Sequence, residues 1–200
     1  MIANYHTLRF IADDLSNQLA GHIVVTTFSQ NRNELVIVCP GNNALTDVFV
    51  VILCDPSRNA LYLRPAFARA RKNTVEFFPQ IHGKRITAIA MQPADRDIRF
   101  SFENGLRLAV QMFGSKANAF LADQEGRVLG AFLRPNDSKG IALQESSRPV
   151  KEIPSNAAAL AEILRSAGHK TVFAALKEGF PLLGPALVRE LLFRAGLAED

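Results

Sequence analysis

The stretch IRFSFENGLRLAVQMF (98–113) decides the fold class. Apolar and polar residues alternate in its first run, 98–103, and apolar residues dominate its second run, 106–113. Asn104-Gly105 separates the two runs, and Asn-Gly between such runs is a strong hairpin signal because both residues tolerate a positive φ. The sequence therefore predicts two antiparallel strands joined by a tight turn.

Similar strand-like runs extend on both sides of this hairpin. Seven of them can be recognised: 22–29, 34–40, 47–54, 59–64, 85–92, 117–123 and 127–134. About nine short strands at regular spacing favour antiparallel sheets closed as a sandwich or barrel over βαβ units. The segment 73–84 is ambiguous, because it is apolar but Pro79 interrupts any long helix.

Helices flank the strand-rich part, so the expected class is α+β. Residues 4–20 carry apolar side chains at three- and four-residue spacing, with Asn4 as a cap and Gly21 at the end. Three further helices are expected, at 156–167, 169–178 and 185–195. We divide the chain into a β-rich body (1–135), a linker (136–154) and a helical module (155–200).

The composition is that of a globular protein. Of the 200 residues, 48% are hydrophobic and 21% are charged, which excludes a disordered chain or a coiled-coil rod. The net charge of +4 is compatible with a nucleic-acid or ribosome partner without being diagnostic of one. Asp13 and Asp14 interrupt the N-terminal apolar pattern, and no apolar run is long enough for a membrane span. We therefore expect a cytoplasmic protein with no membrane partner.

No arrangement of catalytic or metal-binding residues can be recognised. The four histidines show no ligand spacing, and no nucleotide-binding or hydrolase motif occurs. Cys39 and Cys54 each lie in an apolar run without a CxxC pair, which predicts buried reduced thiols. The sequence thus predicts no enzymatic activity, no metal, no cofactor and no small-molecule substrate.

A basic segment, LRPAFARARKN (63–73), is the first of three candidate recognition features. Its cations surround a single aromatic residue and no acidic residue intervenes; they are Arg64, Arg69, Arg71 and Lys72. Such a segment can hold phosphates and stack a base. A solvated loop is an equally good interpretation of the same pattern.

The second feature is the pair Asp95-Arg96, which directly precedes a strand. Alternate residues of that strand are apolar, and Arg99 lies on the opposite face. Extrapolated backward, the alternation places Arg96 at the rim of the apolar face. There the guanidinium can pair with a neighbouring aspartate, or it can bind a phosphate or base edge.

The third feature is GFPLLGPALVRELLFRAGL (179–197), which has the pattern helix, tight turn, helix. The turn contains Gly184-Pro185, and its backbone N–H groups can receive a phosphate as in helix-hairpin-helix modules. A plain αα-hairpin that packs its leucines into a core is the alternative.

Four segments in this order resemble the N-terminal NFACT domain. They are LAGHIV (19–24), Asp95-Arg96, VQMFGSKANAFLAD (110–123) and the helical pattern at 179–197. The family includes fibronectin-binding protein A-like bacterial proteins, RqcH and eukaryotic NEMF. The resemblance covers nearly the whole chain, and the last two segments are its most specific part.

The resemblance implies a fold like the N-terminal part of formamidopyrimidine-DNA glycosylases, followed by a helical nucleic-acid-binding module. It also implies a role in ribosome-associated quality control, with tRNA and the obstructed large ribosomal subunit as partners. The Asp-Arg pair associated with tRNA corresponds to Asp95 and Arg96. In the family's basic tract Asn118 matches, Lys116 stands where histidine is usual, and Ser115 replaces an arginine.

Two other functions remain as alternatives. One is a fibronectin-binding surface adhesin, which the lack of a signal-like N-terminus disfavours. The other is a DNA glycosylase-like module, which is disfavoured because the N-terminal Pro-Glu of those enzymes is replaced by Met1-Ile2-Ala3. Family members continue into a coiled coil and a second NFACT domain. We therefore expect this chain to be the first part of a longer protein, or a short relative.

Overall fold

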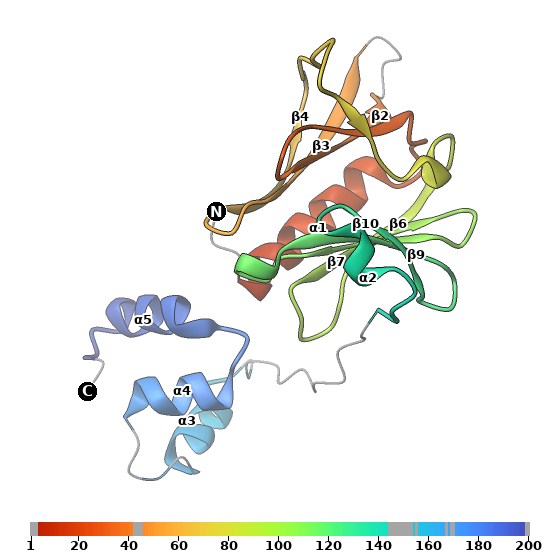
Figure 1. The fold of residues 1–200 in the computed structure, drawn as a ribbon. Coiled ribbons are helices and arrows are strands. Elements are labelled where there is room, and N and C mark those ends of the chain that lie inside the picture. Colours follow the sequence, from red (N-terminus) through yellow and green to blue (C-terminus); the bar gives the residue numbers. More distant parts are fainter. Residues whose placement is uncertain are drawn as a thin grey trace.

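Two five-stranded antiparallel sheets and an N-terminal helix make up most of the molecule (Figure 1). The computed structural model describes residues 4–41, 46–143, 154, 156–166, 168 and 171–198. The α+β class and the antiparallel sheets predicted from the sequence are confirmed.

Sheet 1 has the strand order β4-β3-β2-β1-β5. Its strands are β1 (Thr26–Asn31), β2 (Glu34–Pro40), β3 (Asp47–Cys54), β4 (Asn59–Arg64) and β5 (Val75–Glu76). The bounds predicted for β2, β3 and β4 are confirmed, but β1 begins four residues later than predicted. Ile23 instead forms an isolated bridge with Arg85, which ties the preceding segment to the start of sheet 2.

Sheet 2 has the strand order β10-β9-β8-β7-β6. Its strands are β6 (Ile86–Met91), β7 (Asp97–Phe102), β8 (Arg107–Gln111), β9 (Asn118–Ala122) and β10 (Val128–Ala131). The hairpin predicted at Asn104-Gly105 joins β7 to β8. Only Gly105 of this pair has a positive φ, 78°, and Phe102 donates to the carbonyl of Leu106 at 3.0 Å. The loop therefore has three residues, not two.

Helix α1 (Tyr5–Leu19) lies between the two sheets (Figure 1). Asn4 caps it, with Oδ1 accepting from the Thr7 N–H at 2.9 Å, as predicted. The buried face of α1 joins the inner faces of both sheets in one core, to which it contributes Leu8, Ala12, Leu15 and Leu19. Full burial of one such leucine is worth about 1.5–3 kcal/mol, so this stripe anchors both sheets.

The helices after the body have a core of their own. Helix α2 (Pro135–Ser138) leads into residues 139–143, which run beside β10 through the bridge between Arg127 and Ala142. Further along the chain lie α3 (Ala157–Ser166), α4 (Val172–Gly179) and α5 (Gly184–Arg194). Their shared apolar cluster contains Leu176, Phe180, Leu183, Val188 and Leu192. Most of the predicted linker, 144–153, lies outside the described residues.

The connection between β4 and β5 crosses the outer face of sheet 1. These strands are the two edges of the sheet, so residues 65–74 must pass over it (Figure 1). We call this segment, together with Arg64 directly before it, the strap. Phe67 packs there against an apolar cluster separate from the main core, which contains Phe28, Val36, Val38 and Phe49.

Gln30 fastens the strap to the sheet. Its Nε2 donates to the carbonyl of Ala68 at 3.2 Å, and its Oε1 accepts from the N–H of Ala70 at 2.8 Å. Thr74 adds a hydrogen bond from its hydroxyl to the carbonyl of Ala70 at 2.9 Å. The strap is therefore an ordered cover on the sheet, not a free loop.

We expect Gln30→Ala to loosen the strap without unfolding the body. Each lost hydrogen bond is worth about 0.5–1.5 kcal/mol, so the local opening of residues 68–72 should become more frequent. Native-state amide exchange at Ala70 measures this opening. Gln18→Ala, which removes a comparable exposed hydrogen bond on α1, is the control. Unchanged exchange at Ala70 would contradict the role of Gln30.

Candidate nucleic-acid interface

The turn between β6 and β7 holds Asp95 and Arg96 in a fixed position. The N–H of Gln92 donates to the carbonyl of Asp97 at 2.8 Å, which closes the turn. Ala94 sits at its apex with a φ of 55°, a conformation uncommon for a residue with a side chain. Asp95 Oδ1 accepts from the N–H of Arg96 at 2.8 Å. The carboxylate of Asp95 therefore bonds the backbone of Arg96 and not its guanidinium.

Arg96 is exposed and directly precedes β7. The guanidinium lies over the ring of Phe113, with 5.7 Å from Cζ to the ring centroid. The carbonyl of Arg96 accepts from the N–H of Met112 at 2.9 Å, so the turn is held against the end of β8.

Lys116 lies at the same end of sheet 2. It follows Phe113 in the short 3-10 helix η2 (Gly114–Lys116), and its side chain is exposed. The carbonyl of Gly114 accepts from the N–H of Ala117 at 3.0 Å and from Nδ2 of Asn59 at 3.1 Å. Asn59 thereby links the start of β4 to this end of the second sheet. We call Asp95, Arg96, Phe113 and Lys116 together the turn site.

Asn118 lies beneath this surface and does not face solvent. Its side chain is 7% exposed and bonds both backbone groups of Leu133. Nδ2 donates to the Leu133 carbonyl at 2.9 Å, and Oδ1 accepts from the Leu133 N–H at 2.8 Å. Asn118 thus secures the chain that follows β10, and it supports the turn site from within.

A buried ion pair, which the sequence analysis missed, lies next to the turn site. Arg99 Nη2 and Asp97 Oδ2 are 3.3 Å apart, and the two residues are 5% and 1% exposed. The predicted alternation was correct, because Ile98 and Phe100 point into the main core. The opposite face of β7 is nevertheless covered as well. Two opposite charges two residues apart in an apolar strand were the available signal for this pair.

The cations of the strap form a second, separate surface. Arg64, Arg69, Arg71 and Lys72 are all exposed. Strand β4 begins at Asn59, beside the turn site, and ends at Arg64. Because a strand rises about 3.4 Å per residue, these two residues are about 17 Å apart along β4. Arg96 and Lys116 thus lie at the same end of sheet 2, and the strap lies away from that end.

Gly184 belongs to the helical module. It begins α5 with a φ of 66°, which glycine adopts without strain, and Pro185 follows in the first turn. The tight turn predicted between the last two helices is therefore present. In the described part of the chain, α4 and α5 pack on each other around Phe180 and Val188.

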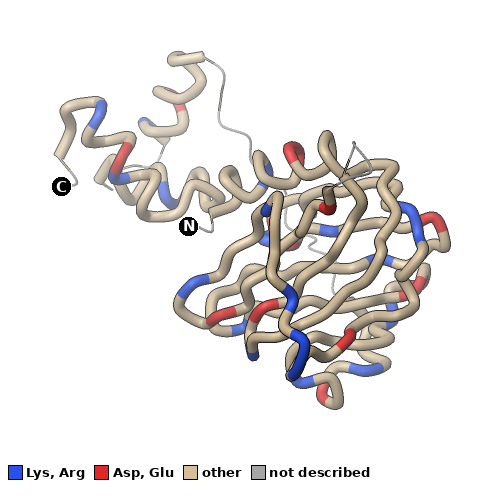
Figure 2. The backbone as a smooth tube through the Cα atoms, turned by 90° about the horizontal axis from the view of Figure 1, so that it is seen from above, with Lys and Arg blue, Asp and Glu red and all other residues tan. Residues whose placement is uncertain are grey.

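Other parts of the described structure offer little chemistry. Burial raises the pKa of both Cys39 and Cys54 to about 12, which keeps these free thiols protonated. No group of metal-ligating side chains occurs among the described residues. No described helix has both the length and the apolar character needed to cross a bilayer. Basic and acidic residues are interspersed over the body (Figure 2).

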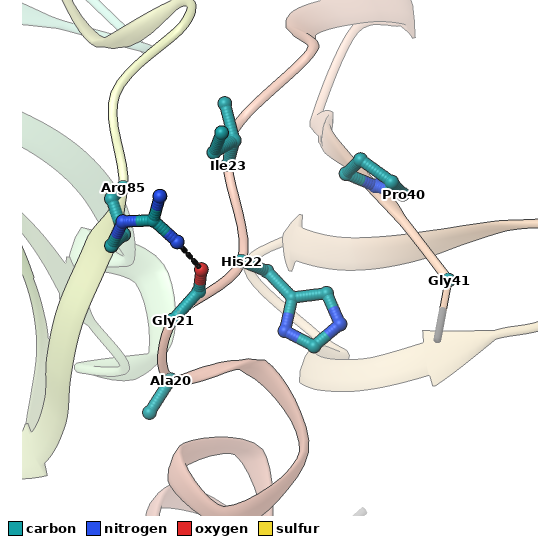
Figure 3. A pocket seen from close by; sticks show the side chains of 7 residues that line it. All are labelled: Ala20, Gly21, His22, Ile23, Pro40, Gly41 and Arg85. Atoms are coloured by element: carbon teal, nitrogen blue, oxygen red, sulfur yellow. Dashed lines mark hydrogen bonds between the residues drawn. The ribbon is translucent and has the colours of Figure 1, made fainter. Parts of the chain in front are cut away.

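An open pocket of about 400 Å³ lies between the end of α1 and the end of β2. Figure 3 shows its lining, in which Arg85 turns toward the backbone of Gly21. Arg85 Nη1 donates to the carbonyl of Gly21 at 2.5 Å, and Nε lies 3.9 Å from Glu103. Because its arginine is already engaged, this pocket is a weaker candidate than the turn site.

Comparison with solved structures confirms the fold. The chain superposes on the N-terminal domain of fibronectin-binding protein PavA from Streptococcus pneumoniae with a TM-score of 0.78 at 16% identity, covering 97% of this chain and 80% of that one. The fibrinogen binding protein from Staphylococcus aureus gives 0.70 at 16% identity, covering 99% and 77%. The N-terminal part of the fibronectin/fibrinogen-binding protein from Streptococcus suis gives 0.70 at 18%, covering 96% and 80%.

Comparison of the amino-acid sequence alone gives no match. No family model matches the chain, and no curated protein does. The resemblance to fibronectin-binding protein A-like proteins is therefore confirmed as a likeness of fold.

We expect the buried pair to make the stability depend on pH. Burial raises the pKa of Asp97, and the neighbouring Arg99 opposes that rise only in part. The folded protein then binds the proton of Asp97 more tightly than the unfolded chain does, so this group lowers the stability as the pH rises above about 4. Asp97→Asn removes that titration.

Urea unfolding at pH 4 and pH 7 tests this expectation. The free energy of unfolding of Asp97→Asn, minus that of the parent, should be larger at pH 7 than at pH 4. Asp123→Asn, which removes a more exposed carboxylate paired with Arg127, is the control. A relative stability that stays constant or falls with pH would show that the pKa of Asp97 is not raised.

Proposed function

We propose that this chain is the RNA-binding N-terminal domain of a ribosome-associated quality-control factor. In this proposal it engages tRNA and the obstructed large ribosomal subunit in the cytoplasm, and it supports the addition of residues to stalled chains. The observation that carries the proposal is the placement of Arg96. Its backbone is fixed by Asp95, and its guanidinium is exposed over Phe113.

The chemistry of the turn site suits a nucleic acid. Within the described residues neither Arg96 nor Lys116 forms an ion pair, so both charges are available to a ligand. A guanidinium supported by an aromatic ring keeps a planar set of donors, which matches phosphate oxygens and base edges. Lys116 adds a point charge at the same end of the sheet.

Binding of fibronectin is the second candidate function. The solved structures that share the fold are named for binding fibronectin or fibrinogen. We rank this function second because the exposed guanidinium of Arg96, which lies over Phe113, suits a phosphate or a base edge. The fibronectin-binding alternative assigns no role to a particular residue of this chain.

We expect Arg96→Ala to weaken tRNA binding about 5- to 100-fold, because one charge-assisted contact is worth about 1–3 kcal/mol. Lys116→Ala should weaken it less and reduce the salt dependence of binding by about one counterion. Fluorescence anisotropy with labelled tRNA at several salt concentrations measures both effects. Arg9→Gln, on the exposed face of α1, controls for the loss of one charge. Equal affinities for Arg96→Ala and Arg9→Gln would refute the assignment.

Immobilised fibronectin separates the two candidate functions. The RNA-binding proposal predicts no saturable binding of this chain to fibronectin by surface plasmon resonance. Saturable binding that survives Arg96→Ala, together with unchanged tRNA affinity in that variant, would favour the adhesin.

A further inference from the structure

The strap carries arginines that are stacked on aromatic rings. Arg64 Cζ lies 5.3 Å from the ring centroid of Phe67, and Arg69 Cζ lies 4.5 Å from that of Phe28. The two rings meet edge to face at 5.7 Å. Two guanidinium groups and two rings therefore form one continuous series across the outer face of sheet 1.

This stacking suits phosphate groups better than bases. Phe28 is buried and Phe67 is half-buried, so neither ring offers a free face on which a base can stack. A guanidinium held over a ring still has N–H groups that it can donate to two phosphate oxygens. Arg71 and Lys72 follow on the strap and form no ion pair within the described residues.

Glu76 already pairs with one of these guanidinium groups. Its Oε1 lies 3.5 Å from Nη2 of Arg69, and the side chains of Arg69 and Glu76 are 40% and 60% exposed. Glu76 is held in place by β5, where it pairs directly with Phe28, the residue on which Arg69 stacks. A carboxylate and a phosphate offer the same pair of oxygens to a guanidinium. A phosphate that binds Arg69 would therefore compete with the carboxylate of Glu76.

We propose that the outer face of sheet 1 binds the phosphate backbone of RNA, and that Glu76 is an internal competitor which occupies Arg69 until a phosphate replaces it. The choice of RNA as the partner rests on the proposed function. The surface itself is separate from the turn site, so the two can be tested independently.

Glu76→Gln is the decisive variant. If Glu76 competes with phosphate for Arg69, its loss should tighten RNA binding, whereas the loss of a purely structural ion pair should not. An exposed pair is worth about 0.2–1 kcal/mol, so we expect the affinity for a labelled 20-nucleotide poly(U) to rise about 1.4- to five-fold. Glu103→Gln is the matched control, since it removes the same charge and releases Arg85 from a comparable exposed pair on the other sheet. The proposal is overturned if Glu76→Gln binds poly(U) no more tightly than Glu103→Gln does.

Arg69→Gln provides the opposite test, with Arg9→Gln as its control. Binding of poly(U) should weaken, and the slope of log affinity against log salt should fall by about one unit. If Arg96→Ala weakens tRNA binding while Arg69→Gln matches Arg9→Gln, the strap proposal fails and the proposed function stands. If Arg69→Gln weakens poly(U) binding while Arg96→Ala leaves tRNA affinity unchanged, the strap proposal stands and the turn site is wrong. Binding of poly-glutamate in preference to poly(U) overturns RNA as the partner.

Discussion

The order of strands in sheet 1 imposes the constraint on which both the outer surface and its charges depend. Strands β4 and β5 are consecutive in the chain but lie at opposite edges of the sheet, so the residues between them must cross one face. The inner face is filled by α1 and the main core, which leaves the outer face. The side of this connection that faces away from the sheet is exposed to water and carries basic residues. Phe67 points the other way, toward the sheet.

The turn site depends on a different constraint, which is the satisfaction of buried polar groups at one end of sheet 2. Asn118 bonds both backbone groups of Leu133, and Asn59 bonds the carbonyl of Gly114. The amide of Asn118 ties β9 to the chain that follows β10, and the amide of Asn59 ties η2 to the start of β4, without using any charge of the surface. The cations Arg96 and Lys116 are therefore left outside, on a base that buried hydrogen bonds keep in place.

The sequence predicted what is local and missed what depends on distant partners. Strands β2, β3 and β4 begin and end at the predicted residues, because their hydrophobic runs end at turn residues that are adjacent in the chain. Strand β5, with only two residues, is too short to show a period. The alternation along β7 gave the face of Arg99 correctly, but no local pattern shows that this second face is covered. The path of the strap across sheet 1 depends on the strand order, which could not be predicted from the sequence.

Two acidic residues beside arginines illustrate why the site could be predicted only in part. In Asp95-Arg96 the carboxylate accepts from a backbone N–H, so the guanidinium remains available to a ligand. In Arg69 and Glu76 the carboxylate faces the guanidinium itself, so a phosphate must compete with it. In both cases the sequence shows an acidic residue and an arginine. Only the structure shows whether the carboxylate holds the backbone of the arginine or competes with a ligand for its guanidinium. The turn site therefore offers its charge at all times, whereas the charge of Arg69 becomes available only as a phosphate displaces Glu76.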